Sequence, residues 1–173
     1  MSGSIQVYYG NGRGKTTAAL GLGIRAAGVG KQVIMVQFLK KKHSDTLDFL
    51  KKLEPELQIF RFEKAACGFS DLSPKERQEQ MLNIKNALGY SRKVLDTGQC
   101  DLLILDEIFG LVDYDIITID ELLQLIAVKK DSVDLILTGR KLPDEIREIA
   151  NCVYSIHKEK EQSPEILSQG VFE

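Results

Sequence analysis

A glycine-rich loop near the N-terminus constrains the fold of this chain more than any other feature. The loop, Gly10–Thr17, reads GNGRGKTT and directly follows the apolar run Ile5–Tyr9, which predicts a strand. A helical pattern then extends from about Lys15 to Ala27. A strand, a glycine-rich turn and a helix N-terminus form a cradle for anions, because successive backbone N–H groups can point at phosphate oxygens. The segment therefore predicts a nucleotide-phosphate site.

The residue types of this loop match those of a P-loop. Lys15 brings a positive charge to phosphate oxygens, and Thr16 offers a hydroxyl to Mg²⁺. The usual spacing would place a glycine at position 9, where this chain has Tyr9, so the loop is one residue short and holds phosphates in a modified way. The predicted ATP-binding residues of the loop are Gly10, Asn11, Gly12, Arg13, Gly14, Lys15, Thr16 and Thr17.

A second motif, Leu102–Glu107 (LLILDE), is an apolar run that ends in two adjacent carboxylates. This is the Walker B pattern, in which one carboxylate orders the shell of a Mg²⁺ ion and its neighbour lies close to the phosphates. Because the motif follows the glycine-rich loop in the same chain, we predict that Thr16, Asp106 and Glu107 serve a metal ion.

Two further groups of basic residues are open to more than one interpretation. Arg140 follows Thr138-Gly139 at the end of a predicted strand. Carboxyl ends of parallel strands line ligand crevices, so Arg140 is either a contact for phosphate or another anionic group, or an ordinary surface side chain. The run Lys40–Lys42 is interpreted as a solvated loop rather than a site that steers an anion.

Short β-branched runs alternate with helical stretches along the chain, which favours crossover units and an α/β fold with a mostly parallel sheet. Ser73-Pro74-Lys75-Glu76 and Thr118-Ile119-Asp120-Glu121 are capping boxes that begin helices. Residues 1–173 are expected to form a single domain with a polar tail from about residue 157. The predicted strands are Ile5–Tyr9, Gln32–Phe38, Leu57–Phe62, Leu102–Asp106, Val133–Thr138 and Cys152–Ile156. The predicted helices lie at 15–27, near 45–53, from 74 onward, at 118–128 and at 143–150.

Composition excludes several classes of function. Lysine and arginine number 23 against 25 acidic residues, a net charge of −2, which argues against a nucleic-acid partner. No apolar run approaches the 18 or so residues of a membrane span. The three cysteines contain no CxxC pair, so neither a disulfide framework nor a zinc site is expected, and free thiols fit the cytoplasm. Two histidines leave little material for histidine-based catalysis.

The loop segment Gly10–Ala19 resembles that of the P-loop-type ATP:corrinoid adenosyltransferases, which act on cobalamin or cob(I)yrinic acid a,c-diamide. The resemblance extends in order from about residue 5 to 154. It includes Arg25-Ala26, Gly28, Gly30-Lys31, Val36-Gln37-Phe38, Leu105-Asp106-Glu107 and Thr138-Gly139-Arg140.

This resemblance implies a three-layer P-loop NTPase (RecA-like) fold. It also implies transfer of the 5′-deoxyadenosyl group of ATP to the Co(I) centre of a reduced corrinoid, with release of triphosphate. Mg²⁺ or Mn²⁺, a homodimer and an electron-donating flavoprotein partner belong to the same expectation. Lys15, Thr16 and Glu107 would be catalytic, and Phe69 would lie at the corrinoid face. Because Co(I) is itself the nucleophile, the protein needs only to align the substrates and stabilise the leaving triphosphate.

Two other interpretations of the chain's function remain open. The family often has Gly-Phe-Thr-Trp in its corrinoid loop, where this chain has Gly68-Phe69-Ser70-Asp71. The chain could therefore be a nucleotide-binding module without corrinoid activity. Alternatively, Glu107 could activate water at the γ-phosphate, which would make the chain a P-loop ATPase.

Overall fold

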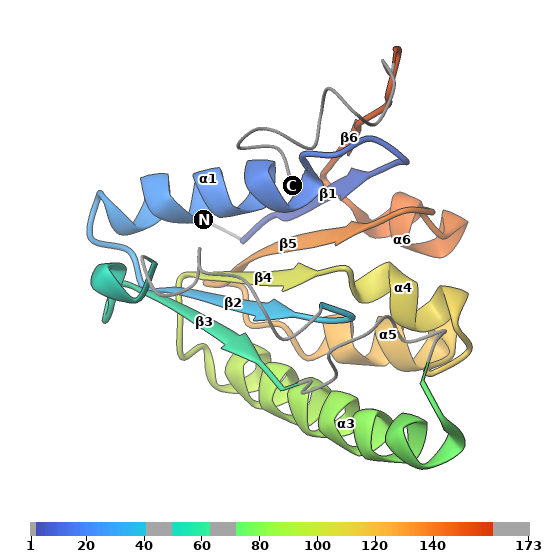
Figure 1. The fold of residues 1–173 in the computed structure, drawn as a ribbon. Coiled ribbons are helices and arrows are strands. Elements are labelled where there is room, and N and C mark those ends of the chain that lie inside the picture. Colours follow the sequence, from blue (N-terminus) through green and yellow to red (C-terminus); the bar gives the residue numbers. More distant parts are fainter. Residues whose placement is uncertain (1–2, 41–49, 63–71, 161–173) are drawn as a thin grey trace.

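A computed structural model describes residues 3–40, 50–62 and 72–160, which are built around one six-stranded sheet (Figure 1). The strand order is β3-β2-β4-β5-β1-β6, and every neighbouring pair is parallel. The predicted mostly parallel sheet is confirmed. The strands are β1 Ile5–Tyr9, β2 Val33–Gln37, β3 Leu57–Arg61, β4 Leu102–Asp106, β5 Asp134–Gly139 and β6 Cys152–Ser155.

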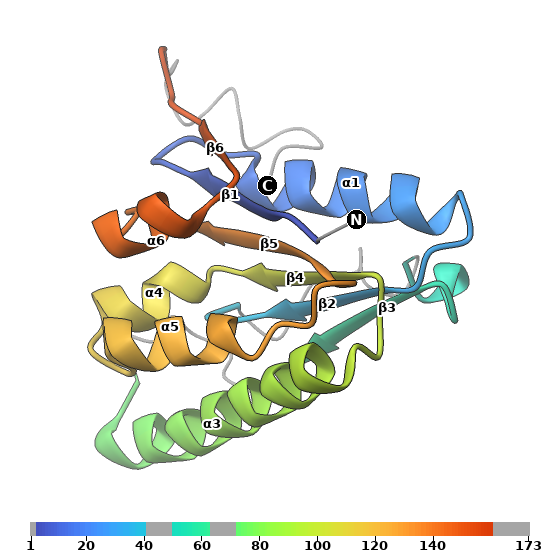
Figure 2. The ribbon, with the colours of Figure 1, turned by 180° about the vertical axis from the view of Figure 1, so that it is seen from behind.

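Helices cover both faces of this sheet, so the sheet is the middle layer of the predicted three-layer α/β fold (Figures 1 and 2). Of the α-helices in the described residues, α1 lies on one face and the other four lie on the opposite face. The bounds are α1 Lys15–Ala27, α3 Pro74–Thr97, α4 Ile108–Asp113, α5 Ile119–Ala127 and α6 Asp144–Ile149. A short 3₁₀ turn, η1 Lys51–Leu53, precedes β3. This turn falls within the range 45–53 for which a helix is predicted, and residues 45–49 of that range lie outside the described part.

Strands β2 and β4 are buried along their whole length, as expected for parallel strands covered on both faces. Alternate side chains enter different cores. Val33 and Met35 of β2 pack with Ile104 of β4 beneath α1. Ile34 of β2 packs with Leu103 of β4 in the opposite core, which also receives side chains of α3, α5 and α6. Continuous apolar runs in the sequence are therefore explained by two cores, one on each face of the sheet.

Both predicted capping boxes are present. The Ser73 hydroxyl accepts the backbone N–H of Glu76, and the Glu76 carboxylate accepts the backbone N–H of Ser73. The Ser73 hydroxyl also donates to the Glu76 carboxylate, and this hydrogen bond, together with the one from the Ser73 backbone N–H, lowers the pKa of the Glu76 carboxyl from its usual value. Thr118 and Glu121 form the same reciprocal pair at the start of α5. Local side-chain bonds thus fix where α3 and α5 begin.

Helix α4 was not predicted from the sequence. It has only six residues, and no serine, threonine or aspartate side chain caps it. Its N-cap is Glu107, which has a left-handed backbone with φ 60°. The chain therefore turns sharply at the end of β4, and the helix that follows keeps Glu107 at the carboxyl edge of the sheet.

The strand order decides which loops meet. Strand β5 lies between β1, which leads into the glycine-rich loop, and β4, which ends in Asp106. All three strands point in one direction, so their carboxyl ends form a single edge (Figure 1). Gly139 ends β5 where an added Cβ would overlap the ring of Phe109 from α4, so only glycine fits there. No helix in residues 3–40, 50–62 or 72–160 is long and apolar enough to cross a membrane.

Candidate functional site

The glycine-rich loop closes around the side chain of Lys15. The Lys15 ammonium donates hydrogen bonds to the carbonyl oxygens of Gly10, at 2.8 Å, and Gly12, at 3.0 Å. Burial lowers the pKa of this ammonium, and the nearby charges of Arg140 and Lys40 also lower it, while Glu107 acts in the opposite direction. The loop therefore holds a buried positive charge at the N-terminus of α1.

The first half of the loop is hydrogen-bonded to the segments that follow β5 and β6. The backbone N–H of Ile156, just beyond β6, donates to the carbonyl of Tyr9, and the N–H of Gly12 donates to the carbonyl of Ile156. The Gly10 N–H points instead toward the carbonyls of Gly139 and Arg140. Gly10 has φ 123°, and a Cβ there would overlap the Ile156 carbonyl, so the path requires glycine.

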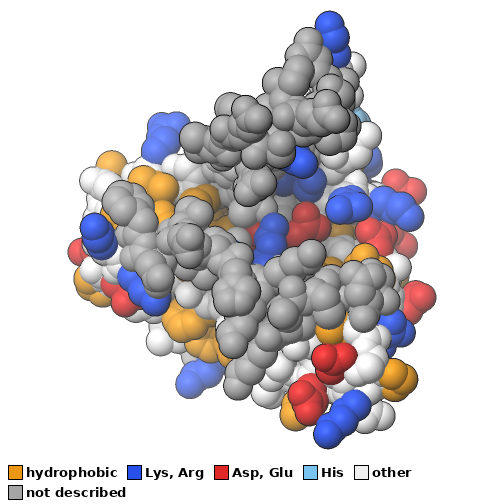
Figure 3. Space-filling view, viewed as in Figure 1, with side chains coloured by type: hydrophobic (Ala, Val, Ile, Leu, Met, Phe, Trp, Pro, Cys, Tyr) orange, Lys and Arg blue, Asp and Glu red, His pale blue; other side chains and the backbone are white. Residues whose placement is uncertain are grey.

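A cavity of about 630 Å³ opens beside this loop. Its volume is in the range of small-molecule sites. Four cationic side chains and one carboxylate line it, so the cavity attracts an anion. Basic and acidic side chains lie close together at the edge toward which the strands point (Figure 3). The lining residues are Asn11, Gly12, Arg13, Gly14, Lys15, Thr16, Thr17, Lys40, Glu107 and Arg140.

A fully buried carboxylate, Asp106, joins the loop to three strands. The Thr16 hydroxyl lies 2.9 and 3.0 Å from its two oxygens. The Thr138 hydroxyl of β5 donates to Oδ1 at 2.7 Å, and the Gln37 amide of β2 donates to Oδ2 at 3.0 Å. Thr138 also accepts the backbone N–H of Glu107 at 2.8 Å. Asp106 therefore fixes the Thr16 hydroxyl at the mouth of the cavity without lining the cavity itself.

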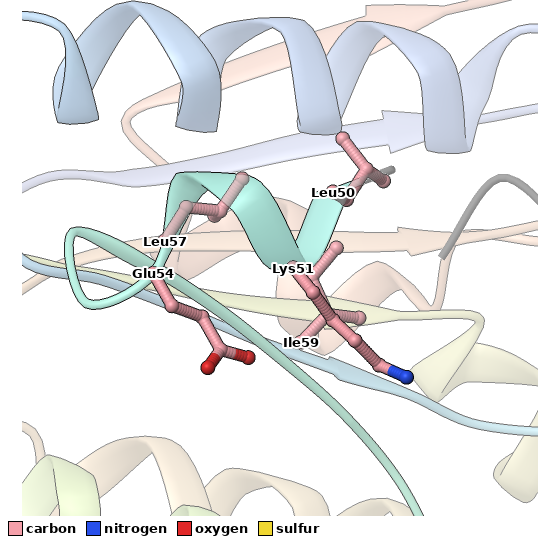
Figure 4. Close-up of a pocket in the computed structure, with 5 residues that line it drawn as sticks. All are labelled: Leu50, Lys51, Glu54, Leu57 and Ile59. Atoms are coloured by element: carbon pink, nitrogen blue, oxygen red, sulfur yellow. The ribbon is translucent and has the colours of Figure 1, made fainter. Parts of the chain in front are cut away.

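A second cavity of about 420 Å³ adjoins the first and shares Lys40, Glu107 and Arg140 with it. Glu107 therefore stands between the two spaces. The second cavity is completed by Leu39, Gly110, Asp113, Tyr114 and Lys141. A third hollow, of about 70 Å³, lies at η1 and is far too small for a nucleotide (Figure 4). It is lined by Leu50, Lys51, Glu54, Leu57 and Ile59.

The donor set beside the loop fits a divalent ion that arrives with phosphates. In the described part of the chain, no three His, Cys, Asp or Glu side chains come together as a metal cage. Mg²⁺ usually takes one or two protein ligands and completes its shell with phosphate oxygens and water. The Thr16 hydroxyl, backed by Asp106, offers such a ligand, and Glu107 lies on the same cavity wall.

The structure brings most of the predicted site residues together. Arg140, for which the sequence left two interpretations open, is exposed at the rim and lines both cavities. Gly10 supports the loop without lining the cavity. Phe69, the predicted corrinoid contact, lies outside the described residues.

Sequence reasoning gave no separate role to three residues that the structure places at the site. Lys40, interpreted as part of a solvated run, lines both cavities. Gln37 and Thr138 hold Asp106, although the sequence marked them only as members of motifs at strand ends. Their position at the carboxyl ends of buried strands was the signal available for finding them.

Comparisons with known proteins identify the family that the chain matches. A family model described as ATP:corrinoid adenosyltransferase BtuR/CobO/CobP matches residues 1–170. The chain is 32% identical over 158 residues to a corrinoid adenosyltransferase of Escherichia coli strain K12, covering 91% of this chain and 78% of that protein. It is 31% identical, with the same coverage, to the corrinoid adenosyltransferase CobA of Salmonella typhimurium strain LT2.

Among solved structures, the KaiC-like protein PH0186 of Pyrococcus horikoshii OT3 is similar to this chain with a TM-score of 0.58 at 19% identity. The match covers 93% of this chain and 75% of that one. At this identity the likeness concerns the fold alone, and it agrees with the predicted three-layer α/β architecture around a parallel sheet.

Proposed function

The chain belongs to the ATP:corrinoid adenosyltransferase family, and we propose that it carries out the family reaction at the cavity beside the glycine-rich loop. In this reaction the Co(I) centre of a reduced corrinoid donates an electron pair to C5′ of ATP. A cobalt–carbon bond forms, the C5′–O bond breaks, and triphosphate leaves with the electrons of that bond. The observation that carries the proposal is the cation-lined cavity around Lys15.

The charges of this cavity suit a triphosphate leaving group. As the C5′–O bond breaks, negative charge grows on the triphosphate, and fixed cations stabilise that charge without having to reorganise. Lys15, Arg13 and Arg140 supply such cations. Among the described residues that line the two cavities there is no serine, cysteine or histidine. A reaction whose nucleophile belongs to the corrinoid needs none of them.

We further propose that Mg²⁺ or Mn²⁺ accompanies the nucleotide. Thr16 would be its protein ligand, and Asp106 would orient the Thr16 hydroxyl from behind, since the Asp106 carboxylate is buried and already accepts three side-chain donors. Glu107 would face the ion or the reacting end of the nucleotide from the shared wall of the two cavities. When bound, the ion neutralises charge on the phosphates.

The remaining parts of the proposal come from family membership. Phe69 would contact the corrinoid, an electron-donating flavoprotein would deliver Co(I), and the protein would act as a homodimer in the cytoplasm. Next to Phe69 the chain differs from the family pattern, because Asp71 stands where the family often has a tryptophan.

The proposal is tested by incubating the protein without oxygen with MgATP and chemically reduced cobalamin. We expect the absorbance spectrum of an alkylated corrinoid to appear and triphosphate to accumulate. ADP and phosphate formed without any corrinoid product would favour the ATPase reading. Binding of MgATP without any effect on the corrinoid would favour a nucleotide-binding module. Either result would overturn the proposed reaction.

A further inference from the structure

Lys40 is directed into the site by an unusual backbone turn. Strand β2 ends at Gln37, and two residues later Leu39 adopts a left-handed conformation with φ 55°. Residues other than glycine seldom adopt this conformation, and where they do it often marks a functional position. The Leu39 side chain lies against Gly110 of α4, where an added Cβ would meet Leu39 Cδ1. The turn is thus packed in place, and the next side chain, Lys40, reaches the loop.

The Lys40 ammonium lies against the oxygens that would receive a metal ion. Its Nζ donates to Thr16 Oγ1 at 3.2 Å and lies 3.5 Å from Asp106 Oδ2. The Asp106 side chain is 0% exposed and that of Lys40 is 30% exposed. A positive charge of the protein's own therefore covers the outer side of the Thr16–Asp106 pair, toward the cavity.

An ammonium and a divalent ion cannot both stand against the Thr16 oxygen, because like charges a few ångströms apart repel strongly in a partly buried site. We propose that Lys40 is a placeholder cation. It blocks free divalent ions from Thr16 while the site holds no nucleotide, and it moves onto the triphosphate when a metal–nucleotide complex binds. This inference rests on the proposed function, because it assumes that the cavity takes a triphosphate.

The cavity offers Lys40 a second set of partners. Lys40 lines the same wall as Glu107 and Arg140, so a small change of its side-chain torsions turns the ammonium from Thr16 toward the space beside the loop. A triphosphate brings several negative charges to that space, and their attraction for the Lys40 ammonium offsets the loss of its contact with Asp106. Free metal brings only positive charge. Metal and nucleotide would therefore bind together, and metal alone would bind poorly.

The test compares the wild type with Lys40→Met, which keeps most of the side-chain length and removes the charge. Lys31→Met is the matched control, because Lys31 forms a half-exposed ion pair with Asp134, 3.7 Å away, and does not line the cavity. Mn²⁺ binding without nucleotide is measured from the electron paramagnetic resonance of the free ion. Binding of inorganic triphosphate is measured by calorimetry in EDTA. Thermal unfolding shows that each variant is folded.

We expect Lys40→Met to bind Mn²⁺ at least about tenfold more tightly than the wild type, as removal of a nearby like charge predicts. Adding Thr16→Val to Lys40→Met should abolish that gain. The same Lys40→Met variant should bind triphosphate about tenfold more weakly. Lys31→Met should resemble the wild type in both measurements.

Two results would overturn the inference. Equal Mn²⁺ affinity in Lys40→Met and wild type would show that Lys40 does not guard the metal position. Unchanged triphosphate affinity would show that Lys40 does not move onto the phosphates. A wild type that binds neither triphosphate nor ATP would contradict the proposed function instead, and the Mn²⁺ comparison would still decide whether Lys40 excludes the free ion.

Discussion

Replacing Thr138 with valine tests whether the Thr138 hydroxyl joins the end of β5 to Asp106 and Glu107 at the end of β4. The Thr138 side chain is fully buried, and valine has nearly the same shape, so the change removes one hydroxyl without opening a cavity. The hydroxyl donates to Asp106 Oδ1 at 2.7 Å and accepts the Glu107 N–H at 2.8 Å. Loss of a hydrogen bond to a charged group costs about 1.5–3 kcal/mol, and the partly buried Glu107 N–H left without its acceptor adds about 1 kcal/mol, at the low end of the range for a buried group.

We therefore expect Thr138→Val to lower the free energy of unfolding by about 3 kcal/mol. At a slope of about 2 kcal/mol per molar urea, the unfolding midpoint falls by about 1.5 M. Urea titration followed by circular dichroism measures this shift. The slope should stay unchanged, because the variant buries the same surface.

Thr97→Val serves as the matched control. The Thr97 hydroxyl also donates one hydrogen bond, to the Lys93 carbonyl, but the residue is exposed at the end of α3. Its midpoint should change by less than about 0.3 M, since exposed substitutions usually alter stability by under about 0.5 kcal/mol. If Thr138→Val shifts the midpoint no more than Thr97→Val does, the hydroxyl does not join the strands as described.

Three further predictions address the site. Lys15→Ala should lower the rate of ATP use by about 100-fold or more, because it removes a cation aimed at the phosphates, and full activity in a rate assay would remove the loop from the mechanism. Phe69→Ala should weaken adenosylation of the corrinoid more than binding of ATP, and equal losses of the two would contradict its place at the corrinoid face. Burial lowers the pKa of Lys15 below its ordinary value of 10.5. At pH values between that lowered pKa and 10.5, the folded chain therefore binds fewer protons than the unfolded chain. Lys15 should therefore make the free energy of unfolding rise as pH increases through that window. Denaturant titrations at several pH values measure this rise, which should be absent in Lys15→Met. The same pH dependence of the free energy of unfolding in wild type and variant would show that Lys15 does not cause it.

Much of the fold follows from local patterns. Strands β1 and β4 have the predicted bounds because each is a short apolar run with clear ends, and α3 begins where Ser73 and Pro74 predict. Helix α4 escaped prediction because it is short, lacks a side-chain cap and starts from a left-handed Glu107. Such a turn depends on tertiary packing rather than on residue preference.

The site was predictable only in part, for a physical reason. Lys15 and Thr16 belong to a contiguous motif whose geometry is local, so the sequence alone reveals them. The bonds from Thr138 and Gln37 to Asp106 depend on which strands are neighbours, and a strand order such as β4-β5-β1 is a long-range property. The position of Lys40 likewise depends on one backbone turn at the end of β2.

The most direct test of the proposed reaction is the stoichiometry of its products. Protein, MgATP and a chemically reduced corrinoid react without oxygen, and the alkylated corrinoid and triphosphate are measured in the same samples. We predict one triphosphate for each cobalt–carbon bond formed, with both products formed about 100-fold or more slowly by Lys15→Ala. Release of ADP and phosphate in place of triphosphate, or triphosphate without alkylated corrinoid, would contradict it.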